Sequence, residues 1–136
     1  MQLSLFEQPP RLRVLVACEC SGAVRDAFIA AGHDAVSCDV QPDANPNGGP
    51  HIEGDVLAVL DQGWGLMVAH PPCRYLCSSG LHWNKRRPGR AALSDEALVF
   101  VRKLMAAPIP RIAIENPVGR IGTQIRPADQ WLHPYQ

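Results

Sequence analysis

Long apolar runs are missing from this 136-residue sequence, in which no stretch approaches the roughly eighteen apolar residues of a membrane span. The first ten residues also lack the basic start and the apolar core of a signal peptide. These absences argue against a membrane protein and against an exported one. We therefore expect the protein to work in the cytoplasm.

An excess of charge of one sign is lacking too, because thirteen basic and thirteen acidic residues cancel. No overall field then draws the protein toward nucleic acid or membrane, so any such binding must be local. The five cysteines are an odd number in a cytoplasmic setting, which predicts thiols rather than a disulfide framework. Cys73 and Cys77 lie near His70, but no second pair of ligands follows them, and we predict no metal site.

The sequence does contain one set of alternating apolar runs and helical patterns, without internal repeats or a linker. Its length is that of a single domain, with a core at 11–126 and a C-terminal tail at 127–136. Prolines and glycines cluster at 41–50, 70–72 and 108–134, which indicates stiff, ordered loops. We predict an α/β fold with a mostly parallel sheet and flanking helices.

The first elements are typical of a nucleotide-binding α/β domain. A β-rich apolar run at 13–18 predicts a buried strand, and a helix is expected at 23–31 because Val24, Ala27, Phe28 and Ala31 recur at spacings of three and four. Between them lies the tight turn Glu19-Cys20-Ser21-Gly22. Such a turn brings backbone amides and a helix N-terminus close to a ligand.

Two aspartates follow the next strands. The strand expected at 35–38 ends in Asp39, about twenty residues after the glycine turn, where such folds bind a ribose hydroxyl. Acids also cap strand ends for other reasons, so both interpretations of Asp39 stay open. After a turn-rich loop at 41–50 and a short strand at 51–54, Asp55 is expected to cap a helical turn at 56–60, and it can serve a ligand as well.

The central stretch of the chain is the loop that begins His70-Pro71-Pro72-Cys73, directly after a strand expected at 66–69. Consecutive prolines hold Cys73 rigidly above the sheet edge at which open α/β folds place their chemistry. Two interpretations are open for the thiol, namely a nucleophile or a small packing residue. The next segment, 81–90, holds the only dense basic patch, with Trp83 beside four cations: Lys85, Arg86, Arg87 and Arg90. It is either a phosphate-binding surface or a solvated loop.

The last predicted elements bring an acid to the same edge. Ser94 is expected to cap a helix at 95–106, whose buried stripe is Leu98, Val101, Leu104 and Met105. A final strand is expected at 111–114, followed by Glu115, and 118–136 shows no periodicity. A thiol and a carboxylic acid at adjacent strand ends suit attack on a pyrimidine ring, with the thiolate adding at carbon 6 and the acid stabilising the charge at ring nitrogen 3. Carbon 5 then accepts a methyl group.

These residues resemble the catalytic core of the S-adenosylmethionine-dependent DNA cytosine-5 methyltransferases, particularly short phage and prophage proteins. Pro71-Pro72-Cys73 matches the family's nucleophile motif, and Glu115-Asn116-Pro117 is similar to its Glu-Asn-Val motif. The glycine turn and Ala31-Gly32 resemble its first motif, and the matches cover about 13–126 in the family's order. The resemblance implies a Rossmann-like fold and a bacterial or phage-infected host cell.

The resemblance also implies roles for individual residues. Cys73 would be the nucleophile and Glu115 its acidic partner. S-adenosylmethionine would contact nine residues: Glu19, Cys20, Ser21, Gly22, Asp39, Val40, Asp55, Val56 and Pro71. The cytosine would contact Pro72, Asn116 and Arg126, while Lys85, Arg86, Arg87 and Arg90 would bind the DNA.

The sequence departs from the family in two places. Glu19 and Ser21 replace glycines of the first motif, and the chain ends at Gln136, where the family continues into a target-recognition region. A partner protein that supplies recognition is therefore expected, and a module that binds cofactor or nucleic acid without turnover is the alternative function. A cysteine hydrolase would need a histidine base, for which His70 is the nearest residue.

Overall fold

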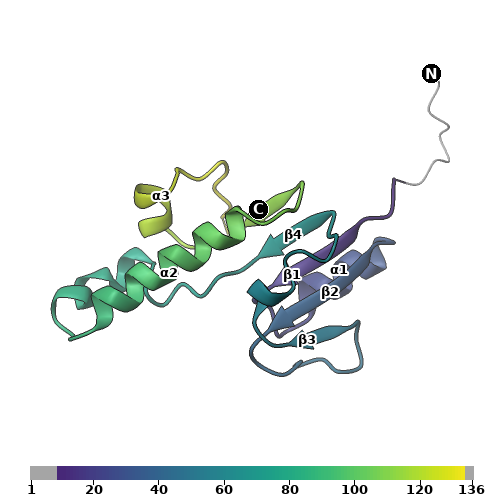
Figure 1. The fold of residues 1–136 in the computed structure, drawn as a ribbon, viewed down its shortest axis with the longest axis horizontal. Coiled ribbons are helices and arrows are strands. Elements are labelled where there is room, and N and C mark those ends of the chain that lie inside the picture. Colours follow the sequence, from purple (N-terminus) through teal and green to yellow (C-terminus); the bar gives the residue numbers. More distant parts are fainter. Residues whose placement is uncertain (1–8, 134–136) are drawn as a thin grey trace, which may run out of the picture.

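The computed structural model describes residues 9–133 and has five parallel strands in one sheet, flanked by helices (Figure 1). The strand order is β3-β2-β1-β4-β5, with β1 at Arg13–Ala17 in the centre. The other strands are β2 (Asp34–Asp39), β3 (His51–Glu53), β4 (Leu66–Ala69) and β5 (Ile112–Ile114). This arrangement is α/β and Rossmann-like, and it confirms the predicted fold class at that level.

Helices cover both faces of the sheet. The first helix, α1 (Ala23–Ala30), packs Val24 and Phe28 against Val14, Val16 and Ala35 on one face. The second face is covered by the 3₁₀ turn η1 (Val56–Ala58) and the C-terminal half of α2 (Arg90–Met105). In Figure 1, α2 lies in the left half of the view, with α3 (Arg120–Gln124) above it. A second 3₁₀ segment, η2 (Ser78–Lys85), precedes α2.

The register of the strands places the predicted site residues at one edge. Ala17 pairs with Cys38 on one side and with Ala69 on the other, and Ala69 pairs with Ile114. The ladder continues one step beyond the strands, because the amides of His70 and Glu115 donate to the carbonyls of Ala17 and Ala69, each at 3.0 Å. The carboxyl ends of four strands therefore deliver Cys18, Asp39, His70 and Glu115 to the same edge.

Two predictions about the helices were wrong. The second helix begins at Arg90, not at 95, because Gly89 lies in the left-handed region and is followed by the strong helix formers Ala91, Ala92 and Leu93. Ser94 is consequently a buried residue inside the helix rather than its cap. The helix α3 lies in the part of the chain without periodicity, since five residues are too few to show it.

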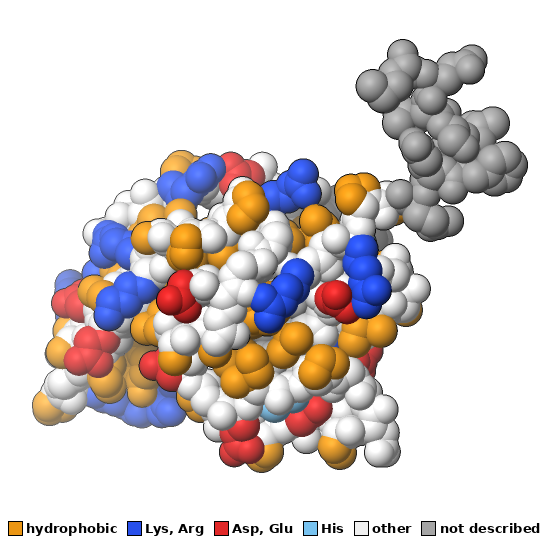
Figure 2. All heavy atoms as spheres, turned by 45° about the vertical axis from the view of Figure 1, so that its right-hand side comes forward, with side chains coloured by type: hydrophobic (Ala, Val, Ile, Leu, Met, Phe, Trp, Pro, Cys, Tyr) orange, Lys and Arg blue, Asp and Glu red, His pale blue; other side chains and the backbone are white. Residues whose placement is uncertain are grey.

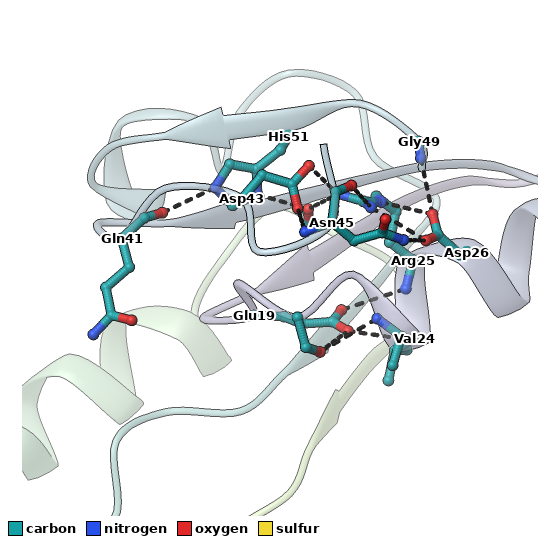
Figure 3. Close-up of polar contacts among 12 residues, drawn as sticks. Glu19, Val24, Arg25, Asp26, Gln41, Asp43, Asn45, Gly49 and His51 are labelled. Atoms are coloured by element: carbon teal, nitrogen blue, oxygen red, sulfur yellow. Dashed lines mark hydrogen bonds and ion pairs between the residues drawn. The ribbon is translucent and has the colours of Figure 1, made fainter. Parts of the chain in front are cut away.

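A buried arginine ties α1 to the loop at 41–50 (Figure 3). The Arg25 side chain is 0% exposed, whereas Ala27 and Ala31 on the same helix are exposed. Its guanidinium donates to Asp26 at 2.8 Å, to Asp43 at 3.0 Å and to the Ser37 hydroxyl at 2.9 Å. The hydrogen bond from Arg25 lowers the pKa of Asp26 to about 2. This network fixes the loop that follows the end of β2.

The face of the molecule drawn in Figure 2 carries charges of both signs. On the face drawn in Figure 2, basic and acidic side chains alternate with apolar ones. Such a surface agrees with the balanced composition. Within residues 9–133, no helix has the length and apolar character needed to cross a membrane.

Candidate active site

A pocket of about 370 Å³ opens at the carboxyl edge of the sheet, between the strand ends and α2. Its size falls within the range of small-molecule sites, about 300–1,000 Å³. Four residues predicted to contact a cofactor line it, namely Asp39, Val40, Asp55 and Val56. The structure thus brings together residues from the ends of β2 and β3 that are separated in sequence.

The two pocket aspartates are each held by one oxygen. Asp39 accepts a hydrogen bond from the amide of Gln41, and Asp55 accepts one from the amide of Leu57, both at 2.9 Å. The second contact makes Asp55 the N-cap of η1, as predicted. The other oxygen of each carboxylate makes no hydrogen bond within the described part of the chain, which leaves it available to hydroxyl or amino groups of a ligand.

The pocket is completed by residues that the sequence did not single out as site residues. Cys18, Cys38 and Gly54 come from the sheet edge, Tyr75 from the loop after β4, and Leu93, Glu96, Ala97 and Phe100 from α2. The α2 residues recur at i, i+3, i+4 and i+7, so they form one helical face. That spacing indicates a face but does not say whether the face packs on protein or on a ligand, which is why sequence reasoning missed it.

The two prolines before Cys73 lie in different environments. Pro72, predicted to contact the cytosine, lines the pocket. Pro71, predicted to contact the cofactor, is buried, and its carbonyl accepts a hydrogen bond from the Asn116 amide at 2.8 Å. Asn116 therefore fastens the segment after β5 to the segment after β4.

The turn between β1 and α1 already contains an anion. Glu19 is 6% exposed, and its carboxylate accepts hydrogen bonds from the amides of Val24 at 2.7 Å and Arg25 at 3.3 Å (Figure 3). Ser21 donates to the same carboxylate at 3.0 Å. Glu19, Cys20, Ser21 and Gly22 do not line the pocket, and the helix N-terminus expected to face a ligand is occupied from within the chain.

Cys73 begins a tight turn that is held on several sides; we call residues 73–80 the thiol loop. The carbonyl of Cys73 accepts hydrogen bonds from the amides of Leu76 and Cys77, at 2.9 and 3.0 Å. From α2, Ser94 donates to the Tyr75 carbonyl at 2.6 Å. On the other side, the amide of Arg120 donates to the carbonyl of Leu76 at 2.8 Å. The loop is thus clamped between α2 and the segment that leads into α3.

Arg90 also belongs to this clamp, contrary to the expectation that it binds DNA. Its side chain is buried, and its guanidinium donates to the carbonyls of Arg74 at 2.9 Å and Gly80 at 3.3 Å. It also lies over the Tyr75 ring, 4.9 Å from the centroid. A phosphate contact from this position would break those bonds. The role predicted for Arg90 is therefore wrong, and its role is to position the thiol loop.

The remaining predicted DNA contacts lie on the surface. Lys85, Arg86 and Arg87 are exposed, and Arg86 and Arg87 stack over Trp83 at 5.9 and 4.5 Å. Arg126, predicted to contact the cytosine, pairs with Asp129 at 2.5 Å. That ion pair directs its guanidinium along the C-terminal segment.

The acid expected to assist Cys73 lies beside a histidine. Oε2 of Glu115 is 3.4 Å from Nδ1 of His70, and the Glu115 side chain is 62% exposed. Nε2 of His70 is buried without a hydrogen-bond partner. Together with the Asn116 bond to Pro71, this contact places the predicted acid next to the loop that carries the thiol.

The cysteines at this edge of the sheet differ in pKa and in burial. Burial raises the pKa of Cys18 to about 12 and that of Cys38 to about 11, and the nearby Asp39 adds to both shifts. In the thiol loop, a hydrogen bond from the Ser79 side chain lowers the pKa of Cys77. Cys38 is buried, as expected for a packing residue, whereas Cys18 and Cys20 are only partly covered.

The geometry contains no evident metal centre, since no group of three or more His, Cys, Asp or Glu side chains within 9–133 is arranged to hold an ion. What it does offer is a pocket with hydrogen-bond acceptors on one side of a clamped thiol and a carboxylate on the same sheet edge. Comparisons with models of protein families, with curated proteins and with solved structures find no match to this chain.

Proposed function

We propose that this protein transfers a methyl group from S-adenosylmethionine to carbon 5 of cytosine in DNA, with Cys73 as the nucleophile and Glu115 as its acidic partner. The main support is the pocket lined by Asp39 and Asp55, because one of its walls is Pro72, the residue before Cys73. A cofactor in that pocket would lie beside the thiol loop. The residue pattern and the pocket support the same chemistry.

The charges around the pocket favour a nucleoside cofactor without phosphate. Asp39, Asp55 and Glu96 line the pocket, and no lysine or arginine does. A dinucleotide would need a free helix N-terminus for its pyrophosphate. At α1 those amides already bind Glu19, and a phosphate would meet its negative charge. An uncharged or cationic tail avoids that repulsion, which agrees with S-adenosylmethionine.

The chain's own residues would carry the chemistry in order. The Cys73 thiolate adds to carbon 6 of the flipped cytosine, and Glu115 stabilises the charge that develops at nitrogen 3. S-adenosylmethionine, when bound, supplies an electrophilic methyl group to carbon 5. A base then removes the proton from carbon 5, and the thiolate leaves carbon 6. The clamp formed by Arg90 and Ser94 keeps Cys73 at a fixed height during these steps.

The target base must leave the duplex before the thiol can reach it. Lys85, Arg86 and Arg87 are exposed near the thiol loop in sequence and would hold the phosphate backbone. The acidic and neutral residues that line the pocket offer no such contact, so DNA binding would depend on residues 85–87. A partner protein would supply recognition of the target sequence.

The alternative is a module that binds the cofactor or nucleic acid without turnover. It is favoured by the position of Glu115, whose side chain is 62% exposed. A hydrogen bond from so exposed a carboxyl group to the cytosine would compete with hydrogen bonds to water. In this function the pocket would still bind ligand, and Cys73 would form no adduct.

Two measurements test the proposal. Calorimetry should detect S-adenosylhomocysteine binding and a much weaker response to ADP, and Asp55→Asn should lower the affinity for S-adenosylhomocysteine. DNA containing 5-fluorocytosine should form a covalent adduct that maps to Cys73 when S-adenosylmethionine is present, whereas DNA with unmodified cytosine should release the protein. Binding without an adduct would favour the alternative, and absence of binding would overturn both.

A further inference from the structure

A second thiol lies one turn away from the proposed nucleophile. The amide of Cys77 donates to the carbonyl of Cys73 at 3.0 Å, which closes a turn that brings the two residues together. Both side chains are partly exposed. The turn therefore places two partly exposed thiols on neighbouring backbone positions of one loop.

The pKa of Cys77 is lowered from its ordinary value by hydrogen bonding. Its Sγ lies 3.3 Å from the Ser79 hydroxyl, and this hydrogen bond is the main cause of its lowered pKa. The amide of Gly80 adds a further hydrogen bond. Thiolates rather than thiols react with peroxide, so a lowered pKa favours oxidation of Cys77. The pKa values of Cys18 and Cys38 are raised, which disfavours their oxidation.

We infer that Cys77 and Cys73 form a peroxide-sensitive pair, in which Cys77 is oxidised first and Cys73 then closes a disulfide. The Cys77 thiolate attacks hydrogen peroxide, so that the O–O bond breaks, hydroxide leaves and a sulfenic acid forms. The Cys73 sulfur then attacks that sulfenic sulfur, the S–O bond breaks, and water leaves with the proton of Cys73. Two thiols are oxidised and one peroxide is reduced to two waters.

Closure of the disulfide requires a rearrangement of the turn. A disulfide needs Cβ atoms about 3.8 Å apart. Residues 73–77 form a turn rather than a helix, and Cys77 is extended, with φ −73° and ψ 145°. The hydrogen bonds from Arg90, Ser94 and Arg120 hold the carbonyls of residues 74, 75 and 76, so the two thiols must approach each other within this clamp.

The pair gives the site a reversible off state, a consequence that rests on the proposed function. A disulfide consumes the Cys73 thiol, so the oxidised protein has no nucleophile for carbon 6 of cytosine. It also protects that sulfur from irreversible oxidation, because a disulfide is reduced again by thiols. Ligand binding in the pocket does not require the thiol and should persist.

The test is peroxide treatment of the full chain, followed by mass spectrometry of the intact protein and of its peptides. The expected product is one intramolecular disulfide between Cys73 and Cys77, seen as a loss of about 2 Da that dithiothreitol reverses. Cys73→Ser should stop the reaction at the sulfenic acid, so that dimedone labels Cys77. Cys77→Ser should abolish the disulfide.

Controls within the chain make the result decisive. Cys20 is also partly exposed, and its sulfur lies 3.6 Å from the Gln41 side chain, so it reports general surface oxidation. Ser79→Ala should slow the labelling of Cys77, while Ser78→Ala, its matched neighbour, should not. Labelling of Cys20 before Cys77, or a disulfide only between molecules, would overturn the inference. These readouts do not depend on methyl transfer, so failure of the proposed function would appear separately.

Discussion

Replacing Arg25 by methionine tests whether the buried guanidinium holds the first half of the domain together. Methionine keeps most of the apolar stem, so the change removes the charge and the donors while filling the space. The variant leaves Asp26 and Asp43 without their cation, and it leaves the Ser37 hydroxyl without one partner. The loop at 41–50 should then lose its main attachment to α1.

The magnitude follows from the burial of the three charges. Removing one partner of a buried ion pair costs about 3–5 kcal/mol, chiefly because the remaining charge is left without compensation. The side chains of Asp26 and Asp43 are 32% and 13% exposed, so water can partly replace Arg25. We therefore expect the lower end of the range, about 3 kcal/mol. With a urea m-value of about 1.5–2 kcal/mol/M, the midpoint should fall by about 1.5–2 M.

Urea unfolding followed by far-ultraviolet circular dichroism measures this difference. Arg11→Met is the matched control, because Arg11 pairs with Asp34 at the surface, where both side chains are more than half exposed. Such a pair contributes about 0–1 kcal/mol. Arg25→Lys should lie between the two, since an ammonium keeps the charge but cannot reach all the partners. A loss below about 1 kcal/mol for Arg25→Met would refute the reasoning.

Three further predictions concern pH, backbone fit and ligand charge. The pKa of Asp26 is lowered to about 2, so the contribution of its charged form to stability is complete above about pH 4 and is lost as the pH falls toward 2. Measurement of the urea unfolding midpoint as a function of pH should show this loss. In the Arg25→Met variant the same loss should be smaller. A Cβ at Gly119 would lie 1.9 Å from the Leu76 carbonyl oxygen, so Gly119→Ala should lower the free energy of unfolding in urea by about 1–3 kcal/mol. Gly122 has open space around its Cα, so Gly122→Ala should leave the free energy of unfolding unchanged or raise it. Glu96→Gln should weaken the binding of cationic S-adenosylmethionine about threefold relative to uncharged S-adenosylhomocysteine in calorimetry, and Asp95→Asn, outside the pocket, should leave that ratio unchanged.

The strands and the edge where they end could be predicted because their signals are local. Short β-branched apolar runs followed by turn formers gave all five strands, and the rule for parallel sheets then placed Asp39 and Glu115 at one edge. The cap formed by Asp55 was predicted for the same reason, since its partner lies two residues away. Patterns that depend on neighbours in sequence are visible in the sequence.

What could not be predicted depends on partners far along the chain. Arginine is usually a surface residue, and the burial of Arg25 becomes favourable only because Asp43 and Ser37 lie close to it in the fold. Ser94 was interpreted as a cap because serine favours that position, but its hydroxyl binds the Tyr75 carbonyl instead. The burial of Pro71 and the position of Pro72 at the pocket could not be distinguished in the sequence, since tertiary contacts decide which of two adjacent loop residues faces the interior.

The helix α2 gives the pocket and the thiol loop a common wall. One face presents Leu93, Glu96 and Phe100 to the pocket, and the neighbouring face holds the loop through Arg90 and Ser94. Its sixteen residues span about 24 Å as one rigid rod. A tilt of this rod that widened the pocket would also displace the carbonyls that Arg90 and Ser94 hold. A change in the tilt of α2 would therefore alter the volume available to a ligand and the position of Cys73 together.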